Sequence, residues 1–176
     1  MFYEPQPKTG AIYVTCRTSD LGWIHMRKTI GYMITWTTYG SWLQGEEKGY
    51  VKDGKILRGN EKLKEANQAA MVREKVKLSK REKGIVEKAI LESAKRFGQK
   101  ILAISVYSNH VHVVAEYVDV PISAFAGYCK NAARTALNEA GIKGKIWTHG
   151  YDKRFCFDEK HLKAMIEYVK RHGEEK

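Results

Sequence analysis

Long apolar segments, paired cysteines and a leader-like N-terminus are all missing from this chain of 176 residues. No run of about 18 apolar residues occurs, so no segment is expected to span a membrane. The first ten residues lack the basic start and apolar stretch of a secretory signal. The three cysteines, Cys16, Cys129 and Cys156, are widely spaced and form no C-x-x-C pair, which argues against a disulfide framework or a zinc knuckle. We therefore expect a cytoplasmic protein.

Positive charge is what the chain has in excess. Lys and Arg number 31 against 20 Asp and Glu, which gives a formal net charge of +11 at pH 7. Such a charge favours nucleic acid as the partner, although a basic surface can also serve solubility alone. The length predicts one domain with a real core, which we place at residues 27–176. Residues 1–26 show no sustained hydrophobic periodicity. We therefore expect a poorly packed arm there, with a short strand at Ala11–Cys16.

Hydrophobic periodicity predicts an alternation of strands and helices. The predicted strands are Thr29–Tyr39, Ile101–Tyr107, His110–Tyr117, Ile146–His149 and Arg154–Phe157, and the predicted helices are Glu61–Val76, Ser79–Phe97, Pro121–Ala140 and Asp158–Gly173. Ser79 and Glu82 match a capping box, and a two-residue link at 108–109 predicts an antiparallel hairpin. A long glycine-rich loop covers residues 40–60. This order predicts an α+β, ferredoxin-like antiparallel sheet with helices on one face, plus a C-terminal helix.

The sharpest local feature is a pair of histidines within one predicted strand. Side chains alternate along a strand, so His110 and His112 share one face while Val111 and Val113 point into the helix-covered core. Imidazoles about 7 Å apart can bind one metal ion. Two partly exposed histidines on a polar sheet face are an equally good interpretation of this pair alone.

The last predicted helix carries further candidates beside its buried stripe. The stripe follows helical spacing and consists of Leu162, Met165, Ile166 and Val169. Tyr168 and His172 lie on one flank of it. If that flank faces the histidine strand, His172 becomes a third metal ligand and Tyr168 lies next to the ion. Otherwise Tyr168 is a half-buried border residue, and His172 is favoured by the helix dipole. His161 is a rival ligand that we expect to be exposed.

Together these residues resemble the HUH single-tyrosine transposases. The stretch Ser108–Val114 (SNHVHVV) is followed about fifty residues later by a predicted helix that carries Tyr168. Four residues after this tyrosine lies His172, a residue type that can ligate a metal ion. Two more stretches, Thr37–Leu43 and Trp147–Phe157, resemble the REP-associated tyrosine transposases, an insertion-sequence branch. The likeness covers about residues 30–172. Many relatives carry Gln or Asn where this chain has His172, which is itself a competent ligand.

The resemblance implies a metal-dependent single-stranded DNA endonuclease and strand transferase that works next to DNA hairpins. Tyr168 would form a 5′-phosphotyrosine intermediate, and His110, His112 and His172 would hold Mg²⁺ or Mn²⁺. Ligand chemistry alone also allows zinc, nickel or cobalt. A replication-initiator-type nuclease, a metal-dependent hydrolase and a domesticated DNA- or RNA-binding regulator remain alternatives. Some relatives are homodimers that donate the tyrosine helix in trans, and others are monomers.

Basic side chains and one tryptophan are the candidate DNA contacts. They fall into two groups, one on the predicted helix 121–140 and one close to the tyrosine helix. The first group is Lys130, Asn131 and Arg134, and the second includes Lys145, Lys153 and Arg154. A solvated charged face is equally common for such residues. Trp42, in the glycine-rich loop, either stacks on an unpaired base or anchors the loop on the core.

Overall fold

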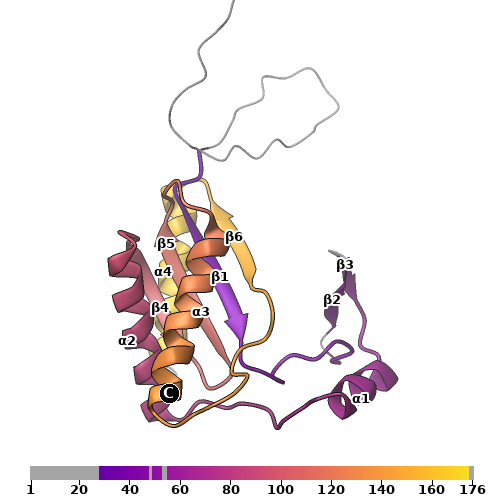
Figure 1. Cartoon of the computed structure of the whole chain (residues 1–176). Helices are drawn as coiled ribbons and strands as arrows, with labels where there is room; N and C mark the ends of the chain where they lie inside the picture. The colour runs from indigo at the N-terminus through magenta and orange to yellow at the C-terminus, as the bar shows by residue number, and fades with distance from the viewer. Residues whose placement is uncertain (1–27, 48, 53–54, 175–176) are drawn as a thin grey trace, which may run out of the picture.

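The computed structural model describes residues 28–47, 49–52 and 55–174 (Figure 1). The predicted arm 1–26 and its strand Ala11–Cys16 lie outside them. The elements are β1 (Gly31–Thr37), β2 (Tyr50–Lys52), β3 (Lys55–Leu57), α1 (Glu61–Ala69), α2 (Lys80–Arg96), β4 (Ile101–Val106), β5 (His110–Glu116), α3 (Ile122–Glu139), β6 (Asp152–Cys156) and α4 (Glu159–Glu174). No helix in the described part of the chain is long and apolar enough to cross a membrane.

Four strands form the central sheet in the order β4-β5-β1-β6, and every neighbouring pair is antiparallel. Helices α2 and α3 cover one face and α4 packs on the other (Figure 1). This is the predicted ferredoxin-like α+β arrangement with an added C-terminal helix, and the prediction is confirmed. Small elements α1, β2 and β3 lie to one side of the sheet (Figure 1).

The main core lies between the sheet and the α2–α3 layer. Trp36 and Tyr32 on β1 are its largest buried side chains, and Val111 and Val113 on β5 point into it as the alternation predicts. Helix α3 contributes the stripe of Ile122, Phe125, Ala126, Cys129, Ala133 and Leu137. The start of α2 is fixed by the predicted capping box, in which Ser79 N donates to Glu82 Oε2 over 2.7 Å.

Two predictions between residues 40 and 78 were wrong. The glycine-rich loop 40–60 contains an antiparallel pair, β2 and β3. The helix predicted at Glu61–Val76 ends at Ala69, and the chain then runs without helix to residue 79. Buried Val76 explains the early end, because its N–H donates to the Tyr39 carbonyl over 2.9 Å. The free energy gained from this long-range pairing exceeds the small free energy that local helix propensity contributes in a charged segment.

The predicted strands after α3 were partly wrong. Residues 146–149 form no strand, and Trp147 makes only an isolated bridge to Thr38. Two backbone bonds, from Tyr39 N to the Ile146 carbonyl and from Thr148 N to the Thr37 carbonyl, hold this segment without a regular ladder, and the Trp147 indole N–H donates to the Lys130 carbonyl. The last strand begins two residues earlier than predicted, because Asp152 already pairs with Thr35 in the β1–β6 ladder.

Candidate active site

The face of the sheet that meets α4 has an apolar part and a polar part. Met33, Ala103 and Val114 make the apolar part, on which α4 packs. The polar part consists of the neighbouring positions of the same four strands, which are Ser105, His110, His112, Thr35, Thr37 and Asp152. Because opposite residues of an antiparallel ladder share a face, these side chains project to the same side.

Helix α4 is held over this face by both its start and its stripe. Asp158 caps the helix as predicted, accepting a bond of 2.8 Å from the His161 N–H. Val169 is fully buried against the apolar part, with Leu162 packed beside it. Gly31 lies under Leu162, where an added Cβ would be 2.7 Å from Leu162 Cδ1. Close packing on the chain's own sheet therefore determines where the end of α4 lies.

The end of α4 lies over the two strand histidines. The ring centroids of His110 and His112 are 4.7 Å apart, and the Tyr168 ring is 6.0 Å from His112. His172 is 4.4 Å from Tyr168. Tyr168 remains 42% exposed, so this residue is not sealed off between the helix and the sheet. The flank with Tyr168 and His172 thus faces the histidine strand, while His161 is exposed at the other end of α4, bonded to Asp158.

Tyr107 belongs to this cluster and was missed in the sequence. Its ring stacks on His110 at 4.3 Å with an interplanar angle of 10°, and it meets His172 edge-on at 5.9 Å. The signal was present, because a two-residue hairpin link places position 107 opposite His110. Tyr107 N donates to the His110 carbonyl at this closing pair.

Burial keeps the strand histidines uncharged. Desolvation, helped by the neighbouring charges of His110, His172 and Arg154, lowers the pKa of His112 to about 4, against an opposing effect of Asp152. Burial, and then His172, also lowers the pKa of His110. Both imidazoles are therefore neutral at pH 7, which is the form that ligates metal ions.

The two strand histidines offer imidazole nitrogens, a donor type that divalent metal ions accept, on one face of β5. His110 Nδ1 lies 2.7 Å from Asn109 Oδ1, and His112 Nδ1 lies 2.7 Å from Thr35 Oγ1. These bonds leave Nε2 of each ring for a ligand. Among the described residues, no three His, Cys, Asp or Glu side chains are placed so that together they could hold a metal ion. His172, at the end of the helix above the pair, is the candidate for a third ligand.

The predicted DNA contacts occupy both faces of the sheet. Lys130 on α3 has its ammonium bound to the carbonyls of Thr148 and Gly150 at 2.8 and 2.7 Å, so it organises the loop before β6. Next to it, Arg134 donates to Asn131 Oδ1 over 2.9 Å. These α3 residues lie across the sheet from the histidines.

The second group surrounds the loop and β6. Lys145 lies 5.0 Å from the ring centroid of Tyr39, and Lys153 lies 5.7 Å from that of Phe155. Arg154 projects to the histidine face and pairs with Asp152 at 3.5 Å. Trp42 is 52% exposed, so its ring is available for stacking rather than buried as a loop anchor.

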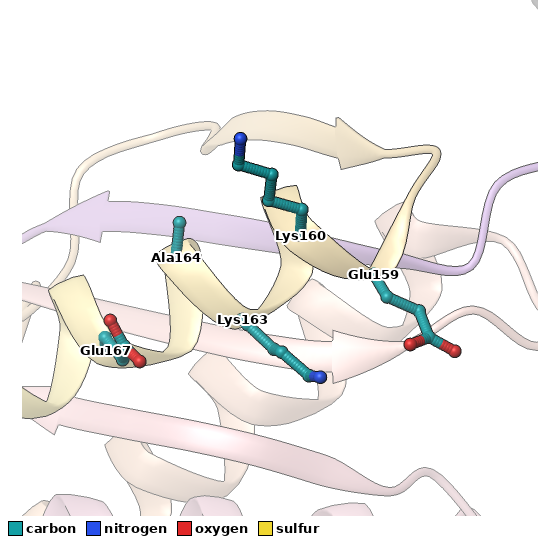
Figure 2. A pocket seen from close by; sticks show the side chains of 5 residues that line it. All are labelled: Glu159, Lys160, Lys163, Ala164 and Glu167. Carbon is teal, nitrogen blue, oxygen red and sulfur yellow. The ribbon is translucent and has the colours of Figure 1, made fainter.

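A shallow open hollow lies on the outer side of α4 (Figure 2). Its lining side chains, labelled in Figure 2, all come from this one helix and are Glu159, Lys160, Lys163, Ala164 and Glu167. None of the clustered histidines or tyrosines takes part. The polar face of the sheet, and not this hollow, is therefore the candidate active site.

A family model places the chain in a known class. It matches residues 69–172, from the end of α1 to His172, and this makes the protein a transposase. The family is that of the IS200-like transposases, and the chain belongs to it. The match includes both strand histidines, Tyr168 and His172.

Solved structures of two transposases are also similar to the chain. One is a REP-associated tyrosine transposase bound to a REP hairpin, with 13% identity, a TM-score of 0.48, and coverage of 98% of this chain and 75% of that one. The other, from Deinococcus radiodurans and assigned as a transposase, has 13% identity, a TM-score of 0.44, and coverage of 88% and 97%. No curated protein matches the chain in sequence.

Proposed function

We propose that this transposase is a metal-dependent endonuclease and strand transferase for single-stranded DNA, with Tyr168 as its nucleophile. The observation that carries the proposal is the position of Tyr168: a half-exposed phenol on α4, with its ring 6.0 Å from His112 and 4.4 Å from His172. Family membership supplies the substrate class, because transposases act on DNA.

The proposed reaction is covalent catalysis by the tyrosine. Tyr168 Oη bonds to the phosphorus of a DNA phosphodiester, and the bond from phosphorus to the 3′ oxygen breaks. The phenol proton ends on the released 3′-OH, and the 5′ phosphate stays on the tyrosine. A 3′-OH from another strand reverses both bond changes and joins the new ends. A phenol with a pKa near 10 is almost wholly protonated at pH 7, so the site must assist its attack.

His110, His112 and His172 are the proposed holders of Mg²⁺ or Mn²⁺. When bound, a divalent ion polarises a phosphate oxygen and stabilises negative charge in the transition state. The chain contributes neutral imidazoles, held in place on β5 by the hydrogen bonds to Asn109 and Thr35. Tyr107 supports the same set by stacking on His110.

The basic side chains are the proposed phosphate contacts. Arg154 lies on the histidine face, where it can reach a phosphate close to the cleaved bond. Lys145, Lys153 and the exposed Trp42 extend the surface away from the site, with Trp42 stacking on an unpaired base. Lys130 acts indirectly by fixing the loop, and Asn131 and Arg134 contact more distant DNA on the α3 side. A hairpin beside the cut, as the family resemblance implies, would span both groups.

The tyrosine is proposed to act in cis. Helix α4 buries its stripe on the sheet of the same chain, and Tyr168 then lies over that chain's own His112. An active site made by one chain needs no helix from a partner, whether or not the protein forms a homodimer.

A covalent-adduct assay tests the proposal. End-labelled single strands from a hairpin-forming pool are incubated with protein and Mn²⁺ or Mg²⁺, and a denaturing gel shows any label that migrates with protein. The wild type should form an adduct that EDTA and Tyr168→Phe both abolish. Tyr128→Phe is the matched control, because Tyr128 is 46% exposed but lies on α3 across the sheet, and this variant should behave as the wild type.

Other results assign other functions. Hairpin binding without an adduct would favour a regulator with this fold. Cleavage that survives Tyr168→Phe would favour a metal-dependent hydrolase that activates water. An adduct that survives EDTA would contradict the metal requirement but keep the tyrosine mechanism.

A further inference from the structure

Two side chains outside the proposed ligand set form hydrogen bonds with the rings of the strand histidines. Asn109 precedes His110 in the hairpin link and places Oδ1 2.7 Å from His110 Nδ1. Thr35 lies on the neighbouring strand, and its Oγ1 is 2.7 Å from His112 Nδ1. Within the part of the chain that the structure describes, each ring is therefore hydrogen-bonded at Nδ1.

The β1–β5 register creates the second of these bonds. Thr35 is directly opposite His112 in the antiparallel ladder, so their side chains are nearest neighbours on the same face. On the other side of Thr35, Asp152 is its partner in the β1–β6 ladder. His112 is only 9% exposed, and a buried ring nitrogen without a partner would cost free energy. The Thr35 hydroxyl satisfies that nitrogen.

The chemistry of the two partners determines which nitrogen carries the proton. An amide oxygen only accepts, so His110 Nδ1 must carry a hydrogen and donate it to Asn109. Its Nε2 then has a free lone pair. A hydroxyl can donate or accept, but Asp152 is opposite Thr35 in the β1–β6 ladder, and its negative charge favours the orientation in which the hydroxyl proton points toward β6 and away from His112. Thr35 then accepts from His112 Nδ1, and Nε2 of this ring is also left with a lone pair.

We propose that Asn109 and Thr35 are positioning residues that fix both strand histidines as Nδ1–H tautomers, with Nε2 directed at the proposed metal site. The inference rests on the proposed metal-dependent function. Partners of this kind orient imidazole ligands, and their removal typically lowers metal affinity by about 10- to 100-fold. Neither residue belongs to the proposed ligand set, so we expect their effect to pass through the histidines.

The test uses variants that remove or keep each bond. Thr35→Val keeps the β-branched shape and removes the hydroxyl, whereas Thr35→Ser keeps it. Asn109→Ala removes the acceptor, whereas Asn109→Asp keeps it. Thr135→Val is the matched control, because the chemical change is the same but Thr135 is exposed on α3, across the sheet from the histidines.

Two measurements on the full chain are needed. Ring-nitrogen chemical shifts of ¹⁵N-histidine protein, recorded without metal at pH 7.5, identify the protonated nitrogen of each ring. Calorimetric titration with Mn²⁺ gives the affinity of the proposed site. Circular dichroism establishes that every variant is folded, so that a lost fold is not mistaken for a lost tautomer.

The expected result is Nδ1–H for both rings in the wild type. Thr35→Val should give mixed tautomers at His112 and weaken Mn²⁺ binding about 10- to 100-fold, with Thr35→Ser and Thr135→Val close to the wild type. Asn109→Ala should do the same at His110, and Asn109→Asp should restore the tautomer.

Other results would contradict the positioning role or the metal-dependent function. Wild-type rings protonated at Nε2 would overturn the proposal, as would removal variants that keep both the tautomer and an affinity within twofold. A wild type with the expected tautomers that binds no Mn²⁺ would support the positioning role while contradicting the metal-dependent function.

Discussion

Replacing Val169 by alanine tests whether the tyrosine helix is docked on its own sheet by its apolar stripe. Val169 is fully buried and packs with Met33, Ala103 and Val114 at the apolar part of the α4 face. It is adjacent in sequence to Tyr168, so the contact that holds the helix also places the proposed nucleophile. Loosening this contact should reduce both stability and adduct formation.

The size of the effect follows from the burial. Val169→Ala removes two methyl groups, which at roughly 0.8 kcal/mol per buried carbon is about 1.6 kcal/mol of lost transfer free energy. A sheet cannot collapse fully into the space, so a cavity term raises the expected loss to about 2–3 kcal/mol. For a domain of this length each kcal/mol lowers Tm by about 2–4 °C, which predicts a decrease of roughly 4–12 °C.

Thermal and urea unfolding, followed by far-UV circular dichroism, measure this loss. Val72→Ala is the matched control: the chemical change is the same, but Val72 is 84% exposed, so its effect should stay within about 0.5 kcal/mol. If Val169→Ala melts at the same temperature as Val72→Ala, the packing of α4 described above is refuted.

Two further predictions concern the arrangement of the site and of the core. Mixing Tyr168→Phe with His112→Ala protein should yield no adduct, because neither chain carries both groups and a cis tyrosine cannot repair its partner; an adduct in the mixture would demonstrate a helix donated in trans. Burial raises the pKa of the Cys129 thiol to about 12, so about one thiol in ten thousand is ionised at pH 8. Mass mapping after iodoacetamide treatment should find Cys129 alkylated in urea but not in the native protein, and equal rates in both states would contradict its burial.

Local patterns in the sequence were sufficient for most of the elements. The capping box at Ser79, the apolar stripe of α3 and the hairpin of β4 and β5 each depend on residues only a few positions apart. The shared face of His110 and His112 likewise follows from strand alternation alone. Interactions of this range are encoded in periodicity, and this is why the predictions were confirmed.

Contacts between distant residues decided the rest. The helix predicted to reach Val76 stops early because that residue pairs with Tyr39, far away in the chain. The segment 146–149 is held by backbone bonds to Thr37 and Tyr39 and by the Trp147 side-chain bond to Lys130, and no propensity scale contains such long-range contacts. Such contacts are set by packing, and a single sequence does not show which distant residues meet.

For the candidate site, the sequence determined which chemistry the chain carries, and the tertiary structure decided where it is assembled. Residue types and spacing alone singled out the histidine pair and the tyrosine with His172 four residues later. Only the docking of α4 brings Tyr168 over His112, and only the strand register brings Thr35 to its ring. The physical reason is that an apolar helix stripe shows that the helix is buried on one side, but not which surface covers it. In the folded chain that surface is the apolar part of the sheet face that α4 contacts.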